Sequence, residues 1–138
     1  MKIATKFSSV LVLFILVMSC ASATIDIPEK YNLDNNFETV DRITAFTIRS
    51  YENLDKQSLI LETTYNDNYL LVLERPRFEI PYGKTNFDYN APSLIAGHDR
   101  VVMDYHSGPE YYVIEKIYKL KGRVQVTEAK NLLHKDQK

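Results

Sequence analysis

The sequence predicts a mainly β fold: a small antiparallel sheet of about five strands that curls into an open barrel, followed by a short C-terminal helix. Two observations point to it. Between residues 42 and 120, short runs rich in β-branched and aromatic residues follow one another, and some alternate between apolar and polar residues. Turn-forming residues separate neighbouring runs at 66–68 (NDN) and at 107–110 (SGPE). Strands joined by such short turns pair in antiparallel fashion.

The beginning of the chain predicts a signal peptide over residues 1–19. Lys2 and Lys6 provide a positively charged start, and nine consecutive apolar residues follow at 10–18. This apolar run is too short to cross a bilayer, because a membrane-spanning helix needs about 20 such residues. We therefore expect the protein to be exported and the leader to be removed.

Two cleavage sites compete at the end of this leader. Residues 17–20 (VMSC) are similar to a bacterial lipobox, which implies that Cys20 receives a lipid and becomes the first residue of the mature protein. Residues 21–23 (ASA) instead match an ordinary secretory site, which would release a free periplasmic protein cleaved after Ala23. We favour lipidation of Cys20, because a cysteine directly after the apolar run of an exported protein is otherwise hard to explain.

A lipid on Cys20 makes a membrane leaflet the first expected partner, with the protein on the periplasmic side. Because Ala21 follows the cysteine in place of an aspartate, the resemblance to bacterial lipoproteins implies the outer membrane rather than the inner one.

The remaining chain predicts a tether and one domain. Residues 20–36 are polar, and Pro28 together with several Asn and Asp residues interrupts any regular period, so we expect a tether without core residues. Residues 37–138 are expected to form a single β-rich domain. The 17 basic residues of the chain include Lys2 and Lys6, so 15 face 18 acidic residues once the leader is removed. This balance argues against nucleic acid as a partner.

The expected strands follow the apolar pattern of each run. In residues 42–52, Phe46 and Ile48 lie on one side and Thr47 and Arg49 on the other, as in a half-buried strand. The other expected strands are 57–65, 68–75, 99–106 and 111–120. The predicted core residues are Phe46, Ile48, Leu59, Leu61, Leu71, Leu73, Val101, Met103 and Ile114. In 69–73, neighbouring apolar residues leave open which set of side chains faces the core.

Two further segments are expected outside the strands. Pro76 and Pro81 interrupt the ladder, since proline cannot donate to it, and residues 75–97 form a long connection that is functional or holds short structure of its own. Residues 126–135 predict a short helix capped by Thr127.

Three stretches, YLLVLERP (69–76), AGHDRVVM (96–103) and YVIEKIYKL (112–120), resemble a family of small proteobacterial exported proteins catalogued as a domain of unknown function. The resemblance covers about residues 38–121, which is most of the folded chain. It implies export, a strand-rich fold and, in many members, a lipoprotein-like leader, and it supplies no activity.

The resemblance also implies a difference at two positions. Members of the family often carry two cysteines, which correspond here to Arg77 and Tyr112, so the implied bridge between the long loop and the last strand is absent. Such a bridge would contribute about 2–4 kcal/mol to the free energy of unfolding. We therefore expect the loop to be held by packing alone, through Phe78, Ile80, Tyr82 and Phe87.

Histidines and carboxylates crowd together between residues 98 and 110. On a strand, Asp104 and His106 would point to the same face about 6.6 Å apart along the backbone and can share a metal ion. A zinc site needs at least one more ligand, from His98 or Glu110. A small metal-assisted periplasmic enzyme built on Asp104 and His106 is therefore an alternative function. We nevertheless expect no metal, cofactor or catalytic residue, because the chain lacks G-x-S-x-G and phosphate-loop motifs.

The aromatic residues indicate a binding role. The chain has ten tyrosines and no tryptophan, and a tyrosine ring suits a binding surface as well as a half-buried sheet. The connection 75–97 carries Phe78, Tyr82, Phe87 and Tyr89, more aromatic surface than a connection requires. We therefore expect a non-enzymatic cell-envelope lipoprotein, a binding or structural module whose loop contacts an envelope protein or a glycan.

Overall fold

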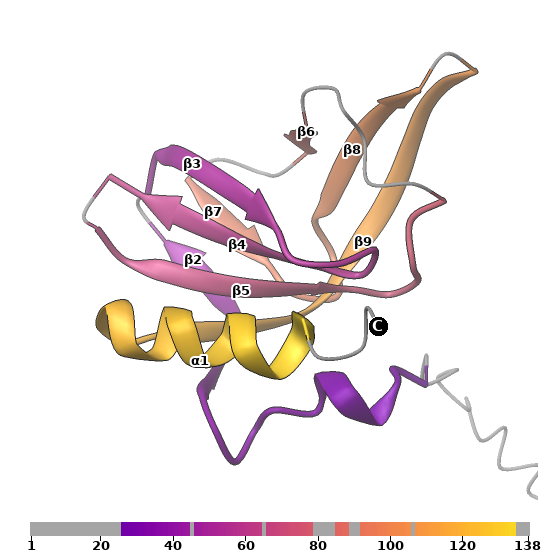
Figure 1. The fold of residues 1–138 in the computed structure, drawn as a ribbon. Helices are drawn as coiled ribbons and strands as arrows, with labels where there is room; N and C mark the ends of the chain where they lie inside the picture. Colours follow the sequence, from indigo (N-terminus) through magenta and orange to yellow (C-terminus); the bar gives the residue numbers. More distant parts are fainter. Residues whose placement is uncertain are drawn as a thin grey trace, which may run out of the picture.

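The computed structural model describes residues 26–44, 46–64, 66–78, 85–88, 92–105 and 107–134. Figure 1 shows a curled antiparallel sheet that forms a half-barrel, with one C-terminal helix packed against it, which confirms the predicted fold class. In chain order the elements are η1 (Glu29–Tyr31), β1 (Glu38–Val40), β2 (Arg42–Thr44), β3 (Ile48–Asn53), β4 (Ser58–Thr63), β5 (Asn68–Leu73), β6 (Thr85–Asp88), β7 (Ser93–Ile95), β8 (Arg100–Tyr105), β9 (Gly108–Leu120) and α1 (Gly122–His134).

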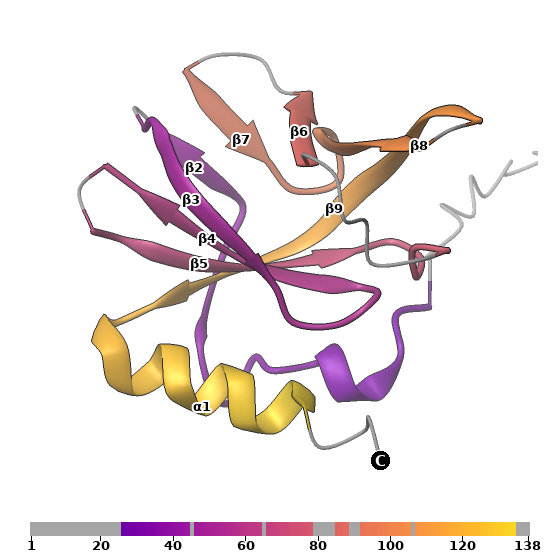
Figure 2. The ribbon, with the colours of Figure 1, turned by 45° about the horizontal axis from the view of Figure 1, so that its top comes forward.

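The long strand β9 organises the sheet. In the described part of the chain, seven strands form one sheet in the order β3-β4-β5-β9-β8-β6, with β1 paired to β9 beside this path. Residues 108–113 of β9 pair with β8, and residues 114–120 pair with β5. β2 and β7 form a separate antiparallel ribbon. A single 13-residue strand therefore joins the two halves of the half-barrel (Figure 2).

Both predicted hairpin turns are present, one of them shifted. Asn66, between β4 and β5, has a φ of 59°, a conformation that asparagine tolerates. Between β8 and β9, Tyr105 pairs with Gly108, and Gly108 has a φ of 119°. The turn therefore lies before Gly108, and residues 108–110 already belong to β9.

The concave side of the half-barrel holds the larger core. Seven of the nine predicted core residues are fully buried there: Leu59, Leu61, Leu71, Leu73, Val101, Met103 and Ile114. Phe46 and Ile48 are only half-buried, because they lie beside and within the edge strand β3. Ile43 of β2 and Leu94 of β7 pair with each other and complete this core.

The convex side of the sheet is buried as well, since α1 lies across it (Figures 1 and 2). Leu70 and Val72 of β5 are fully buried in a second core that includes Ala129 and Leu133 of α1. β5 is therefore covered on both faces, which explains why its apolar run shows no alternation.

Residues 27–37, here called the N-terminal segment, also pack against the second core. Tyr31 and Leu33 are buried in it. The Tyr118 hydroxyl of β9 fixes the segment, because it donates to the Tyr31 carbonyl oxygen (2.8 Å) and accepts from the Leu33 backbone N–H (3.1 Å). The expectation that residues 20–36 carry no core residue is therefore wrong for Tyr31 and Leu33, which cover apolar side chains that the sheet alone would expose.

α1 begins earlier than predicted. Gly122, its first residue, has a φ of 73°, a conformation that favours glycine, at the bend between β9 and the helix. Thr127, the predicted cap, lies inside the helix, where its Oγ1 donates to the Arg123 carbonyl oxygen (3.0 Å). Among the described residues, no helix combines the length and the apolar character needed to cross a membrane.

The described parts of the connection 75–97 contain short structure of their own, β6 and β7. β6 pairs with β8 and forms one edge of the sheet, whereas β3 forms the other. Phe87 of β6 meets Tyr51 of β3 edge to face, with ring centroids 6.0 Å apart. This aromatic contact links the two edges of the half-barrel.

Candidate functional site

Asp55 organises the turn between β3 and β4 and joins it to the N-terminal segment. Its Oδ1 accepts from the backbone N–H groups of Gln57 (2.8 Å) and Ser58 (2.7 Å) and from the Ser58 hydroxyl (2.8 Å). Its Oδ2 accepts from the Tyr31 hydroxyl (2.8 Å) and lies 3.3 Å from the Lys30 ammonium. One buried carboxylate thus closes the turn and holds η1 against it.

These contacts set the charge state of Asp55. Burial raises the pKa of the carboxyl, but hydrogen bonds from Gln57, Ser58 and Tyr31 and the charge of Lys30 outweigh burial. The pKa therefore lies below the ordinary value of 3.8. The charged form is the one that the fold favours, so the carboxylate stabilises the folded state at neutral pH.

Arg77, shortly after β5, binds the same turn from the other side and is only 1% exposed. Its guanidinium donates to Asn53 Oδ1 (2.6 Å), to the carbonyl oxygens of Lys56 (2.9 Å) and Ser58 (3.3 Å), and to the Asp55 carbonyl oxygen. Its backbone N–H donates to the same Lys56 carbonyl (2.7 Å). The planar fork of an arginine suits this array of acceptors, which a lysine ammonium could not reach together.

The two buried charges bind the same turn from its two sides, and the Asp55 carboxylate favours the charged form of the Arg77 guanidinium. Burial lowers the pKa of the Arg77 guanidinium, while the Tyr105 phenol and the Asp55 carboxylate act in the opposite direction. An arginine remains protonated under ordinary conditions. We call Asp55, Arg77 and the residues between β3 and β4 the charged turn.

The charged turn replaces the covalent link that the family resemblance implied. Arg77 stands at one of the two corresponding positions, so the start of the loop is held by hydrogen bonds, and the expectation of packing alone is wrong there. Tyr112 stands at the other position and is fully buried. Its phenol faces the Phe78 backbone amide, and its ring lies under the Arg75 guanidinium, 4.5 Å from the ring centroid. The loop start and the last strand therefore meet as the implied bridge would require.

A cleft of about 270 Å³ opens beside this contact, lined by Phe78, Tyr105, Ser107 and Glu110. Phe78 stands at its rim with 82% of its surface exposed, directly after the buried Arg77. The cleft is therefore formed between the loop start and the tip of the β8–β9 hairpin.

A hydrogen-bonded phenol lies beside the cleft. The Tyr112 hydroxyl donates to Glu110 Oε2 at 2.5 Å. Burial raises the pKa of the Tyr112 phenol, hydrogen bonds with Glu110 and Tyr105 raise it further, and the Phe78 backbone amide lowers it. Tyr112 therefore remains a neutral donor that holds the Glu110 carboxylate in place, and the cleft offers aromatic surface beside one fixed acceptor.

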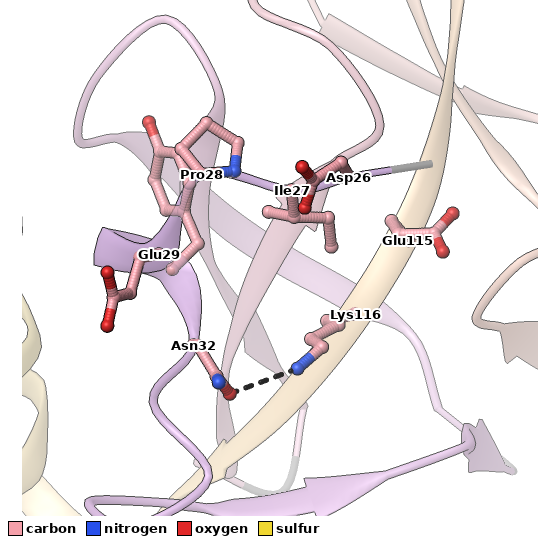
Figure 3. Close-up of a pocket in the computed structure, with 8 residues that line it drawn as sticks. Asp26, Ile27, Pro28, Glu29, Asn32, Glu115 and Lys116 are labelled. Carbon is pink, nitrogen blue, oxygen red and sulfur yellow. Dashed lines mark hydrogen bonds between the residues drawn. The ribbon is translucent and has the colours of Figure 1, made fainter. Parts of the chain in front are cut away.

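A larger and more polar groove, of about 860 Å³, lies between the N-terminal segment and β9 (Figure 3). Its lining comprises Asp26, Ile27, Pro28, Glu29, Tyr31, Asn32, Glu115 and Lys116. The Lys116 ammonium reaches across it to Asn32 Oδ1 (3.4 Å) and to Asp34 Oδ2 (3.1 Å). These contacts hold the N-terminal segment on β9, so the groove marks where that segment docks.

The predicted binding residues fall in different places. Phe78 lies at the rim of the cleft, whereas Phe87 is half-buried against the core and against Tyr51. Tyr82 and Tyr89 lie outside the described residues, as does Cys20, the predicted lipidation site.

The alternative metal ligands do not gather in the described part of the chain. His98 Nδ1 lies 2.9 Å from Asp99 Oδ1, and the buried Asp99 also accepts from the Ile95 backbone N–H (2.7 Å), so this pair closes the turn between β7 and β8. Asp104 accepts from the Asn86 amide (3.1 Å). His106 lies outside the described residues, and within them no three His, Cys, Asp or Glu side chains are close enough to hold a metal ion.

The sequence pattern predicted no role for Asp55, Arg77 or Tyr112, although the family resemblance marked the last two as the positions of the absent bridge. Asp55 carries a usable signal, since an aspartate two residues before a polar strand start is typical of a turn closed by its own carboxylate. Arg77 carries none, because a charged residue beside a proline is ordinarily exposed. Tyr112 lies two residues before the predicted core residue Ile114, so the alternation of a strand places both side chains on the same face and indicates that Tyr112 is buried, as it is.

The geometry describes a small half-barrel domain with an aromatic-rimmed cleft beside a buried charged turn. The chain belongs to a family of unknown function, DUF6491, whose model matches residues 3–137. This match confirms the resemblance to a domain of unknown function and extends it over nearly the whole chain. Comparison with curated proteins and with solved structures gives no match.

Replacing Asp55 by asparagine tests the charged turn. Asp55→Asn keeps an acceptor at Oδ1 but removes the charge, so we expect the free energy of unfolding near neutral pH to fall by about 1–3 kcal/mol. Wild type loses this contribution as the pH falls below the ordinary value of 3.8 and through the lower folded pKa, so the difference between the two proteins should shrink in acid. Urea unfolding at a series of pH values measures it. Asp104→Asn, at an exposed carboxylate, is the control. If the difference in the free energy of unfolding between wild type and Asp55→Asn stays constant into acid, the Asp55 carboxylate does not provide this stability.

Proposed function

We propose that the protein is an exported, non-enzymatic lipoprotein of the cell envelope, anchored through Cys20 on the periplasmic side of the outer rather than the inner membrane. Its folded domain is a binding module that contacts another envelope component through the cleft at Phe78. One observation carries the proposal: the Phe78 side chain is 82% exposed at the rim of a cleft, although its neighbour Arg77 is buried.

The position of Phe78 supports a contact role. The exposed large apolar side chains of the described residues are Phe78, Tyr111, Val124 and Leu132, and of these Phe78 is the one that lines a cleft. An exposed aromatic ring beside a concave surface is typical of a binding site. The charged turn fixes the backbone on which this ring stands, so the ring is presented without the entropy cost of ordering a loose loop.

The anchor rests on the leader and on the lipobox-like residues 17–20. The family match begins at residue 3, so that the leader and Cys20 lie inside the matched range. The docking of the N-terminal segment is compatible with either cleavage, since its first buried aromatic residue, Tyr31, follows both sites.

Cys20→Ser tests the anchor. We expect the variant to move from the membrane fraction to the soluble periplasmic fraction, because the thiol that accepts the lipid is gone. Its melting temperature should equal that of wild type, because Cys20 precedes the packed residues. Mass spectrometry of the wild-type mature protein should find an acylated Cys20. An unmodified N-terminus at Thr24 would instead establish a free periplasmic protein.

A photoreactive phenylalanine analogue at position 78 tests the contact. In living cells we expect it to form a covalent adduct with an envelope component, whereas the same analogue at Val124, which is 80% exposed, should form at least fivefold less. Phe78→Ala should change the free energy of unfolding by no more than about 0.5 kcal/mol, because the side chain is exposed. Equal adduct yields at both positions would remove the cleft from the proposal.

A further inference from the structure

We infer that the component facing the Phe78 cleft is the lipid headgroup layer of the leaflet that carries the anchor. This inference rests on the proposed lipidation of Cys20 and names the partner of the same cleft. Four features of the described residues support it: the short reach from the anchor, the firm docking of the N-terminal segment, the position of Phe78, and the charges around it.

The reach from the anchor is short. Six residues, 21–26, separate Cys20 from Ile27, the first residue of the docked N-terminal segment, so the chain takes seven residue steps between them. A chain of seven residues spans at most about 25 Å when fully extended. The side of the domain from which the chain leaves is therefore kept next to the headgroups.

Docking prevents the N-terminal segment from lengthening this reach. Tyr31 is held through its side chain by Asp55 (2.8 Å) and through its carbonyl oxygen by Tyr118 (2.8 Å). Lys116 holds the next turn through Asp34 (3.1 Å). Since most of these contacts are buried, the effective tether ends at Ile27 and does not extend to residue 36, where the sequence pattern alone would end it.

Phe78 lies on the side where the chain leaves. Asp55 binds Tyr31 through its carboxylate and Arg77 through its carbonyl oxygen, so the docked segment and the loop start lie on the two sides of one residue. Figures 1 and 2 both place the first described residues and the chain just beyond β5 on the same side of the molecule. Phe78 follows Arg77 directly, so this exposed residue lies on the same side of the domain as the start of the N-terminal segment.

The charges around Phe78 suit a lipid surface. Lys56, whose carbonyl oxygen binds Arg77, is exposed, and Arg75 is half-exposed. Cationic side chains near a membrane surface attract headgroup phosphates, and an aromatic ring between them enters the interfacial layer. Glu74, which lies 3.7 Å from Arg75, and Glu110, which lines the cleft with Phe78, offset part of this attraction. The anchor compensates, because it makes the contact intramolecular and raises the effective concentration of the membrane.

A single tryptophan provides the test, because the chain contains none. Phe78→Trp reports on the cleft, and Val124→Trp is the matched control with nearly equal exposure (82% and 80%). Asn68 at the start of β5 pairs with Leu120, so the start of α1 lies at the opposite end of β5 from residues 74–78. Each lipidated protein is reconstituted into vesicles of phosphatidylethanolamine and phosphatidylglycerol, with and without lipids brominated near the headgroup end of the acyl chains.

We expect the brominated lipids to quench the tryptophan at position 78 at least threefold more than the tryptophan at position 124, with a shift of its emission to shorter wavelength. Equal quenching would overturn the inference. Unquenched fluorescence at 78 combined with a protein or glycan adduct in the photochemical experiment would overturn it and leave the proposed function standing. Absence of lipid from the mature protein in mass spectrometry would instead overturn the proposed function itself. Thermal melting of both variants verifies that they are folded.

Discussion

The arrangement of this domain depends on the turn between β3 and β4, which the buried Asp55 carboxylate closes from within and the buried Arg77 guanidinium binds from the other side. Removing a charged side chain from water costs several kcal/mol, and the cost is recovered only when its hydrogen-bonding groups are satisfied and an opposite charge is near. Arg77 meets this condition through Asn53 and three carbonyl oxygens, and Asp55 through the turn amides, Ser58 and Tyr31.

Two parts of the chain that are distant in sequence meet at this turn. The N-terminal segment docks on it through Tyr31, and the loop start docks on it through Arg77. The sheet needs both, since the convex face of β5 and β9 is covered by the N-terminal segment together with α1, and the cleft rim is formed by the residue after Arg77. The same interaction thus covers the second core and sets the position of Phe78. In the proposed setting of a lipid-anchored protein, it also determines how short the tether is.

The strands that could be predicted are those long enough for a pattern to show. β3, β4, β5, β8 and β9 were found because runs of six or more residues carry alternation or a clear apolar block. The single strand expected over 42–52 is nevertheless divided between β2 and β3, which belong to different sheets. β1, β2, β6 and β7 have three or four residues, too few for a period, and their positions depend on partners distant in the sequence. The phase of β5 was ambiguous for a physical reason, since both of its faces are buried. The helix start was misplaced because Thr127 resembles a cap, whereas Gly122 ends the strand and begins the helix.

The candidate site was predictable only in part. Phe78 follows from the excess of aromatic residues in an irregular connection, and its exposure agrees with a contact role. The same exposure shows that the expectation of Phe78 packing inward to hold the loop is wrong. The burial of Arg77 was not predictable, because it depends on carbonyl groups of a turn about twenty residues earlier, and local sequence carries no trace of that contact. The treatment of residues 20–36 as a tether failed for a similar reason: Tyr31 and Leu33 look like isolated apolar residues in a polar stretch until β9 provides Tyr118 as their partner.

The central role of the charged turn is tested most directly by amide hydrogen exchange of the Arg77→Lys variant, followed residue by residue. Lysine retains the charge but cannot donate to four acceptors. We therefore expect faster exchange at two separate places: the turn amides of Gln57 and Ser58, and the amides of Tyr31 and Leu33 in the N-terminal segment. The β8–β9 amides should stay protected, which also shows that the variant is folded. Faster exchange confined to the residues next to position 77, with the N-terminal segment as protected as in wild type, would contradict the central role of the charged turn.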